Sequence, residues 1–276
     1  MSVMEQESFK TGSASKSHSG TAEKRNAFTE LMSSNPKQPK QKTTSPNPAS
    51  LRRPYFGGRD GLGAYTANPE AYPPNIVIYH NADFVAIYDM FPKSSLHLLL
   101  LPRDKTKYLL HPFEAFKDNE FLAKVKFETQ KLRSLAAGEL RRKYGKYSAL
   151  EQERQKALDA DPPPDELPRG RDWDMEVMCG IHAVPSMNHL HVHVIAVDRY
   201  SDRLKSRNHY NSFSTPFFVP IDDFPLSQDD PRVSPRGGHN YLDQDFVCWR
   251  CGRNFGNRFT ELKKHLEEEF VQWRQL

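Results

Sequence analysis

A chain of 276 residues, 37% of them hydrophobic, has room for one or two globular domains. Its formal net charge of +4 does not indicate a polyanion partner, and three cysteines are too few for a disulfide scaffold. No apolar run approaches the roughly 20 residues of a membrane span, and the N-terminus lacks a basic start followed by an apolar block. Composition therefore excludes a membrane protein and a disulfide-stabilised secreted domain, and it predicts a soluble intracellular protein.

Residues 1–54 are rich in Ser, Thr, Pro, Asn, Gln and Lys. Such a segment buries too little apolar surface to offset the entropy lost on folding, so we expect a disordered tail. Through Arg53 it has nine Lys or Arg against four Asp or Glu, a net charge of +5. A solvated basic tail is the simpler interpretation. Nuclear targeting or tethering to DNA is the alternative, for which Lys24-Arg25 and the spaced lysines give a weak signal.

Residues 55–225 predict an α+β domain in which a helix lies between antiparallel strands. The expected elements, in chain order, are strands over 75–80, 83–89 and 96–101, a helix over 113–140, strands over 175–182 and 189–195, a polar loop over 198–210, and a strand or extended segment over 213–221. Residues 138–172 look like an insertion, because a short helical stretch is followed by a triple proline that excludes regular structure. Residues 226–240 are a linker to a small module over 241–276.

The expected strand over 189–195 alternates histidine with apolar residues: His189, His191 and His193 share one face. Leu190, Val192 and Val194 on the other face can pack into a core. Three aligned imidazoles bury poorly, because every ring has two nitrogens that need partners. Neutral imidazoles suit a metal site, and they also suit nucleophilic or acid–base chemistry near neutral pH. A polar strand face without chemistry is the least favoured of these interpretations.

The C-terminal module contains Cys248-x2-Cys251-x13-His265, which is close to the spacing of a ββα zinc finger. About thirty residues cannot fold on apolar burial alone, whereas metal binding supplies roughly 10–16 kcal/mol. The position of a second histidine is occupied by glutamates, and Glu269 lies four residues after His265 on the same helical face. We therefore expect a structural zinc held by Cys248, Cys251, His265 and Glu269. Glu268 or water are alternative fourth ligands, and a redox cysteine pair is the alternative to a metal.

Basic residues surround this module and suit phosphate contacts: Arg250, Arg253, Arg258, Lys263 and Lys264. A single finger reads few bases, so it is expected to anchor on the DNA backbone or a DNA end without specifying sequence.

The histidine pattern resembles the signature of the histidine triad (HIT) superfamily of nucleotide hydrolases and transferases. Followed by a finger of this type, the chain resembles the aprataxin family, in the form that lacks an N-terminal forkhead-associated domain. The similar stretches run from about Tyr55 to the C-terminus, and they include 91–93, 96–98, 180–188, 204–205 and 209–213. The resemblance implies an HIT-type antiparallel sheet with helices, plus a small ββα-like zinc-finger module.

The resemblance also implies an activity, the removal of AMP from 5′-adenylated DNA ends left by abortive ligation, through a covalent histidine–AMP intermediate. His191 is then the nucleophile, His189 and His193 flank it, and His182 stabilises the transition state or assists the leaving phosphate. No metal is expected in this catalytic site. Candidates for contacts with nucleotide or DNA phosphates are Lys93, Ser186, Asn188, Lys205 and His209. Ile76, Ile78 and Ile87 are candidates for an adenosine pocket or for plain core packing.

The resemblance further implies DNA as the partner, AMP as the product, a nuclear location and contacts of the tail with repair proteins. Two alternatives differ in class from a DNA 5′-adenylate hydrolase. One is a general HIT hydrolase that acts on AMP–amine or dinucleoside substrates. The other is a non-catalytic zinc-finger protein that binds DNA, which three aligned imidazoles argue against.

Overall fold

The computed structural model describes residues 58–233 and 241–276, which belong to one compact unit spanning Arg52–Leu276. The expected disordered tail over 1–54 lies outside the described residues, as does the end of the expected linker. Within the described ranges, no helix is long and apolar enough to cross a membrane.

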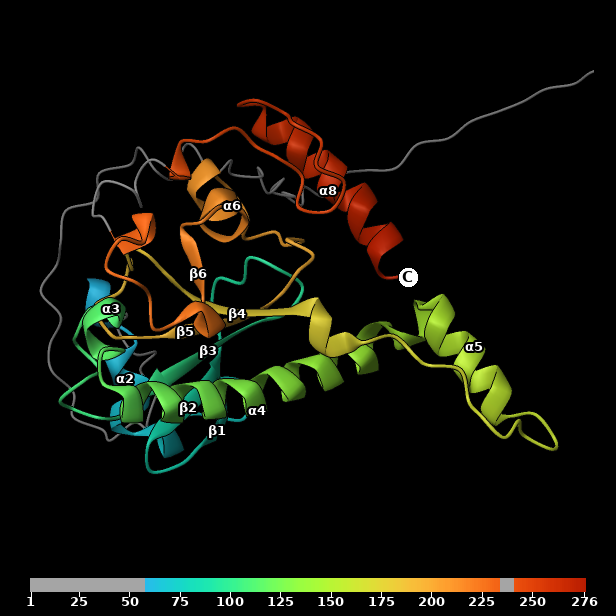
Figure 1. Ribbon diagram of the computed structural model, residues 1–276, viewed down its shortest axis with the longest axis horizontal. Helices are drawn as coiled ribbons and strands as arrows, with labels where there is room; N and C mark the ends of the chain where they lie inside the picture. The colour runs from blue at the N-terminus through green and yellow to red at the C-terminus, as the bar shows by residue number, and fades with distance from the viewer. Residues whose placement is uncertain (1–57, 234–240) are drawn as a thin grey trace, which may run out of the picture. The chain divides into compact units, whose positions relative to one another are not determined.

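The described residues form a six-stranded antiparallel sheet in the order β1-β2-β3-β5-β4-β6 (Figure 1). The strands are β1 (Val77–His80), β2 (Phe84–Tyr88), β3 (His97–Pro102), β4 (Val177–His182), β5 (Val192–Ala196) and β6 (Phe218–Pro220). The β1–β2 turn is closed by Asn81, whose side-chain oxygen accepts from the backbone N–H groups of Asp83 and Phe84. The strands of this first hairpin were predicted within two residues of their observed ends.

The α-helices are α2 (Gly63–Ala67), α3 (Pro112–Ala115), α4 (Asn119–Tyr144), α5 (Ala149–Leu158), α6 (Arg207–Ser214) and α8 (Phe259–Trp273). Short 3₁₀ turns are η1 (Gly58–Asp60), η2 (Pro69–Ala71), η3 (Gly145–Tyr147), η4 (Trp173–Glu176), η5 (Ile221–Asp223) and η6 (Pro231–Val233). The long helix α4 packs against strands β3, β4 and β5 (Figure 1).

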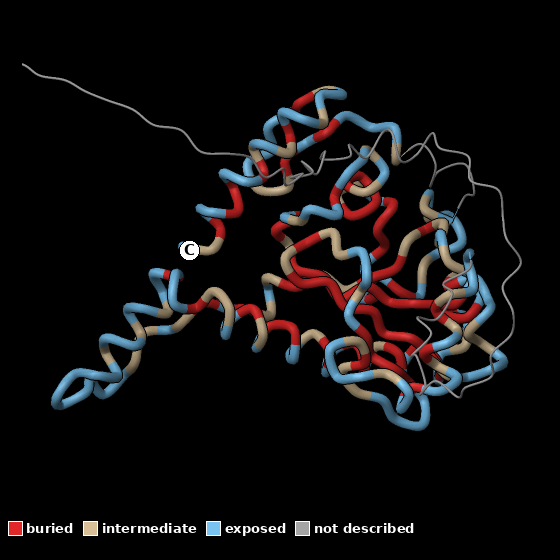
Figure 2. The backbone as a smooth tube through the Cα atoms, turned by 180° about the vertical axis from the view of Figure 1, so that it is seen from behind, coloured by how far each residue is buried: buried red, intermediate tan, exposed pale blue. Residues whose placement is uncertain are grey.

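The sheet separates a core from a cavity because side chains alternate along each strand. On β3, Leu98 and Leu100 point into the main core, which also contains Val125 and Leu132 of α4. His97 and Leu99 lie on the opposite face and line a cavity. Figure 2 shows the sheet as the most buried part of the backbone, with α5 and the loop after it exposed.

Two sequence expectations differ from the structure. The single helix predicted over 113–140 is two helices, because the Asp118 side chain accepts from the N–H groups of Glu120 and Phe121 and starts α4 anew. The predicted loop over 198–210 and strand over 213–221 are interrupted by α6, which Ser206 caps through the His209 N–H.

Candidate active site and zinc-finger site

A cavity of about 520 Å³ opens on the face of the sheet opposite α4. One part of its wall is apolar and is formed by Leu62, Tyr65, Ile87, Leu99 and Met187. Another part is formed by four histidines, His97, His182, His191 and His193. A cavity with an apolar half and a few convergent polar groups has the form of a small-molecule site.

The histidine motif is placed by the end of β4 and the start of β5. His191 and His193 line the cavity, and His182, the last residue of β4, contacts His193 with 4.4 Å between ring centroids. His189 does not line it. Its ring stacks on that of Tyr108, with 4.6 Å between ring centroids, and its Nε2 donates to the carbonyl of Pro102 at 3.0 Å. Regular strand structure begins only at Val192, so His189 leaves the row predicted for three histidines.

Backbone groups determine which nitrogen of each ring carries the proton. His191 Nδ1 lies 2.8 Å from the carbonyl oxygen of His189, which only accepts, so Nδ1 carries the proton and Nε2 keeps its lone pair. The N–H of Lys93 donates to His97 Nδ1, so the proton of His97 is on Nε2. That Nε2–H donates to His193 Nδ1 at 2.9 Å, which leaves the proton of His193 on its own Nε2.

Besides His191 Nε2, two ring nitrogens in this cluster are left for a ligand. Among the described residues, His182 Nε2 and His193 Nε2 are buried and have no hydrogen-bond partner. A buried polar atom without a partner costs stability and marks a site that a bound group satisfies. With its proton on Nε2, His193 can donate a hydrogen bond to an anionic oxygen beside His191.

Burial keeps these rings neutral. It lowers the pKa of His191 below the ordinary 6.5 and lowers the pKa values of His182 and His193 much further. Burial also lowers the pKa of His97 to about 4, against the opposing effect of Asp89. At neutral pH, His191 therefore offers an uncharged nitrogen lone pair, as a nucleophile requires.

His97 and Asp89 are site residues that the sequence analysis missed. Asp89 Oδ2 lies 3.4 Å from His97 Nδ1, and the Asp89 N–H donates to the His97 carbonyl. The signal for His97 was present, since it is a single histidine in the apolar run Leu96–Leu101 and a buried imidazole needs partners. Asp89 gave no such signal, because it stands at the end of an apparent surface hairpin.

The predicted phosphate-binding residues divide into two groups. Lys93, Ser186 and His209 line the cavity, and burial lowers the pKa values of Lys93 and His209. Asn188 and Lys205 do not line it. Asn188 instead donates its side-chain N–H to Asp60 at 2.7 Å, and the Lys205 backbone N–H donates to His209 Nδ1. Of the three isoleucines, Ile87 lines the cavity, whereas Ile76 and Ile78 pack in apolar clusters.

The four predicted zinc ligands converge. Their donor atoms all lie within 4.8 Å of one another, with Cys251 Sγ 3.2 Å and Glu269 Oε1 3.1 Å from His265 Nε2. Two thiols, one imidazole and one carboxylate are a donor set that zinc accepts in tetrahedral geometry. The prediction of Glu269 over Glu268 agrees with this grouping. The turn that carries the two cysteines, here called the knuckle, has Gly252 at φ +73°, a conformation that residues with a Cβ avoid. The two paired strands of a ββα finger are reduced to one bridge, Val247–Asn254.

The finger packs directly on the cavity wall through α6. Tyr210 is fully buried, donates its hydroxyl to the Val247 carbonyl at 2.8 Å and accepts from the Trp249 N–H. These two backbone groups flank Cys248. Two neighbours of Tyr210 on α6, His209 and Phe213, line the cavity, and so does Leu242 from the start of the C-terminal module. The zinc-ligand knuckle and the histidine cluster therefore share one helix as a common support.

Comparison with known proteins agrees with this architecture. An HIT domain model matches residues 71–200, and a model for a C2HE / C2H2 / C2HC zinc-binding finger matches residues 214–272. The aprataxin-like protein of Schizosaccharomyces pombe is 37% identical over 253 residues, which cover 90% of this chain and 94% of the relative. The aprataxin-like protein of Saccharomyces cerevisiae is 37% identical over 215 residues, covering 77% of this chain and 95% of the relative.

Solved structures give the same result. A crystal structure of the aprataxin ortholog Hnt3 in complex with DNA is 38% identical, has a TM-score of 0.61 and covers 78% of this chain and 96% of that chain. The expected fold class, an HIT-type antiparallel sheet with helices and a zinc finger, is thereby confirmed. On its sequence, its sheet and its C2HE-type ligand set, this chain belongs to the aprataxin family.

Proposed function

We propose that this chain is a DNA-repair hydrolase that removes AMP from 5′-adenylated DNA ends, with His191 as the nucleophile. The observation that carries the proposal is the tautomer of His191. Its Nδ1–H is held by the His189 carbonyl, so its Nε2 lone pair is available in the cavity beside the partnerless nitrogens of His182 and His193. An activated nucleophile with adjacent hydrogen-bond donors is the arrangement that group transfer requires.

The reaction has two balanced steps. In the first, His191 Nε2 forms a bond to the AMP phosphorus while the pyrophosphate P–O bond breaks, and the 5′-phosphate of DNA leaves. In the second, water attacks the same phosphorus, its proton leaves to solvent or to a cavity base, and the N–P bond breaks to release AMP. His193 Nε2–H meets the charge that develops on the phosphoryl oxygens, a contact worth roughly a hundredfold or more in rate. His182 is placed to stabilise the same charge or the leaving phosphate.

The cavity walls suggest how such a substrate lies. The apolar side, with Leu62, Tyr65 and Ile87, suits an adenosine group, while Lys93 and His209 line the same cavity and suit its phosphates. Lys93 is a compact cation that suits phosphate, and its position supports the predicted role. DNA as the partner is supported by the solved complex of the related Hnt3 with DNA and by the exposed basic residues of the finger, among them Arg253 and Arg258.

The finger is proposed to bind zinc as a structural metal through Cys248, Cys251, His265 and Glu269. Zinc there would supply folding free energy to the module, and no step of the reaction is assigned to it. We keep the nuclear location and the repair-protein contacts of the basic tail as proposals that rest on the sequence.

One experiment separates the candidate functions. The purified chain is given a nicked duplex bearing a 5′-adenylate and, separately, AMP-lysine, and release of AMP is compared for wild type, His191→Ala and the surface control His80→Ala. We expect the wild type and His80→Ala to release AMP from DNA, and His191→Ala to lose at least a thousandfold. A rapid quench should give an AMP mass adduct on the wild type that His191→Ala lacks.

The outcomes distinguish the alternatives. Cleavage of AMP-lysine with no cleavage of the adenylated duplex would favour a general HIT hydrolase. Binding of the duplex without release of AMP from either substrate would favour a non-catalytic DNA-binding protein. Undiminished DNA release by His191→Ala would exclude His191 as the nucleophile.

A further inference from the structure

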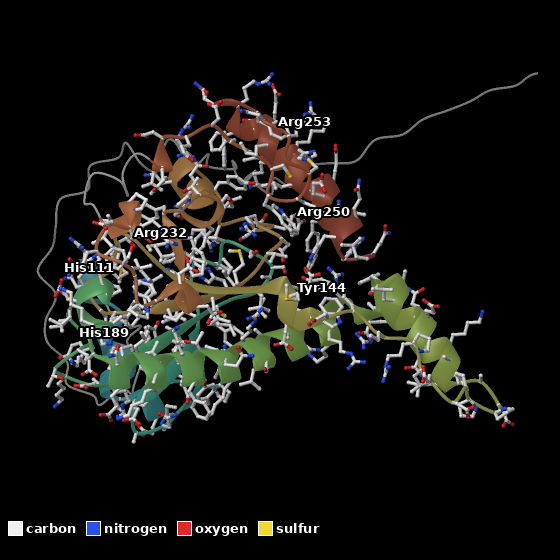
Figure 3. All side chains as sticks on the ribbon, in the orientation of Figure 1. His111, Tyr144, His189, Arg232, Arg250 and Arg253 are labelled. Atoms are coloured by element: carbon white, nitrogen blue, oxygen red, sulfur yellow. The ribbon has the colours of Figure 1, made fainter. Side chains whose placement is uncertain are left out.

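The segment predicted as an insertion, residues 138–172, contacts the end of the zinc-finger helix. The last turn of α8 lies beside the end of α4 and the start of α5 (Figure 1). The Ala149 N–H donates to the Gln275 carbonyl at 3.0 Å, and the Ser148 hydroxyl donates to the Leu276 carbonyl. Tyr144, labelled in Figure 3 between the two elements, packs edge-on against Phe270 and Trp273, with 5.6 Å between ring centroids in both pairs.

Arg171 is the centre of this contact. It is 7% exposed, and its guanidinium packs against two indole rings that are perpendicular to each other, 4.5 Å from the ring centroid of Trp173 and 4.8 Å from that of Trp273. Its Nη1–H donates to the Trp273 carbonyl at 2.7 Å, and its Nε–H donates to Glu176 at 3.0 Å. A planar fork that packs against aromatic rings and donates through several N–H groups at once is a contact that arginine makes and lysine does not. It also satisfies a carbonyl at the end of α8, where a helix lacks intrahelical partners.

Glu176 accepts hydrogen bonds from both Arg171 and Trp273. Its Oε1 accepts from Arg171, and its Oε2 accepts from the indole N–H of Trp273 at 2.6 Å. Trp273 is 1% exposed and belongs to the same apolar core as the sheet. The end of α8 is therefore held by directed hydrogen bonds, ring stacking and burial at once.

The same helix carries two of the four zinc ligands, His265 and Glu269, and the basic residues Lys263 and Lys264. The knuckle end of the finger is fixed separately, by Tyr210 and Asn211 of α6. At about 1.5 Å per residue, the 15 residues of α8 span roughly 22 Å, so a tilt of about 10° about the knuckle moves its far end by roughly 4 Å. Lys263 and Lys264, four and five residues after the start of α8, would then move by roughly 1 Å, and the phosphate contacts expected of them would move with the helix.

We propose that residues 138–172 form a clamp that fixes the zinc-finger helix relative to His191, and that Arg171 is a positioning residue for DNA substrates. This inference rests on the proposed function. A small adenylate fits within the cavity and needs no contact from the finger. An adenylated DNA end must engage the cavity and the finger together, so its turnover depends on the geometry between them, and misplacement by about 1 Å can cost a hundredfold.

The test uses the full-length, zinc-bound chain. Arg171→Met and Arg171→Lys are compared with Arg142→Met, a matched control because Arg142 has a 70% exposed side chain and, among the described residues, forms an ion pair only with Glu139 of its own helix. Turnover of a 5′-adenylated nicked duplex and of AMP-lysine is measured, together with zinc content and hydrogen exchange over residues 266–276. For Arg171→Met we expect faster exchange in that segment, unchanged zinc, a loss of roughly tenfold to a hundredfold in kcat/KM for DNA, and a change below about twofold for AMP-lysine.

Arg171→Lys keeps the charge and the carbon stem, so it guards against a variant that fails to fold, and we expect an intermediate loss for DNA. Equal losses on both substrates would overturn the proposal, because they would show a general effect on stability. Unchanged exchange over residues 266–276 in both variants would overturn it as well. If the wild type cleaves AMP-lysine and not DNA, the proposed function fails, and the clamp is then judged by the exchange measurement alone.

Discussion

His97 Nε2 lies 2.9 Å from His193 Nδ1, and this contact fixes the nitrogen that His193 turns toward a ligand. This contact belongs to a relay of two hydrogen bonds. The relay starts at the backbone N–H of Lys93, which can only donate and which donates to His97 Nδ1. The backbone N–H therefore determines the tautomer of His97 and, through it, the tautomer of His193. The pair lies diagonally across neighbouring strands, since Leu99 of β3 faces His193 of β5.

Replacing His97 by Phe removes the donor to His193 and leaves the shape of the buried ring nearly unchanged. His193 is then free to place its proton on Nδ1, where it cannot serve a phosphoryl oxygen. We expect kcat to fall by roughly tenfold to a hundredfold for both DNA and small adenylates, with little change in KM. Steady-state kinetics beside His80→Phe, an exposed histidine on β1, measures this. Wild-type kcat in His97→Phe would contradict the relay.

The pH–rate profile should show where His191 titrates. Burial lowers its pKa below 6.5, so the ring stays neutral through pH 7 and becomes protonated only as the pH falls below that value. Protonation removes the Nε2 lone pair, and the rate should drop on this acid side. The profile of kcat/KM on a small adenylate, read between pH 4.5 and 8, is the measurement. An acid limb at or above pH 6.5 would contradict the assigned environment.

Stability should depend on pH with the same sign. The folded-state pKa of His97 is about 4 against 6.5 in the unfolded chain, so the unfolded chain binds this proton first as the pH falls. The free energy of unfolding therefore decreases from about pH 6.5 down to pH 4, and this group causes no change above that window. Comparing urea midpoints of wild type and His97→Phe at pH 7.5 and 5 isolates the effect, which should be smaller in the variant. Equal pH dependence of the two proteins would refute it.

The zinc site should depend on Arg250. Its guanidinium lies 2.5 Å from Glu269 Oε2 and holds the carboxylate whose other oxygen lies 3.1 Å from His265. Residues that orient a ligand typically contribute tenfold to a hundredfold in metal affinity. We expect Arg250→Met to weaken zinc binding by that amount in a chelator competition, and Arg253→Met, an exposed arginine of the same module, to leave it unchanged. Equal affinities for both variants would show that Glu269 needs no such support.

The sequence predicted the parts of the fold that depend on local patterns. The alternation of residues 189–195 placed Val192 and Val194 in the core and His191 and His193 on the cavity side, because strand periodicity alone determines this. The helix α6 was missed because its apolar face contains only Tyr210 and Phe213, and tertiary packing against the finger decides such a short helix. Ser206, a typical N-cap residue directly before α6, did indicate the start of this helix in the sequence.

The site was predictable only in part, for a related reason. Residues within one motif, such as His191 or Cys248, can be assigned from spacing. His189 does not line the cavity because β5 begins only at Val192. His97 lies beside His193 because β3 pairs with β5. The packed sheet sets the register between distant strands, and this register cannot be predicted from residue spacing within one strand.

The finger and the sheet share one core, and Trp273 should show it. This side chain is 1% exposed, lies among the same buried residues as Leu100 and Val194, and donates its indole N–H to Glu176. Truncating it leaves a cavity and removes the donor to Glu176 Oε2, so Trp273→Ala should lower the free energy of unfolding by about 3–5 kcal/mol.

Val271 provides the matched control, because it stands on the same helix two residues away and is 42% exposed. We expect Val271→Ala to change stability by no more than about 0.5 kcal/mol. Urea unfolding of the zinc-bound chain, followed by circular dichroism and by release of zinc, gives both quantities. Because α8 contributes to the core beneath the sheet, the two probes should report one transition in the wild type. A Trp273→Ala loss no larger than that of Val271→Ala would show that the finger folds apart from the sheet.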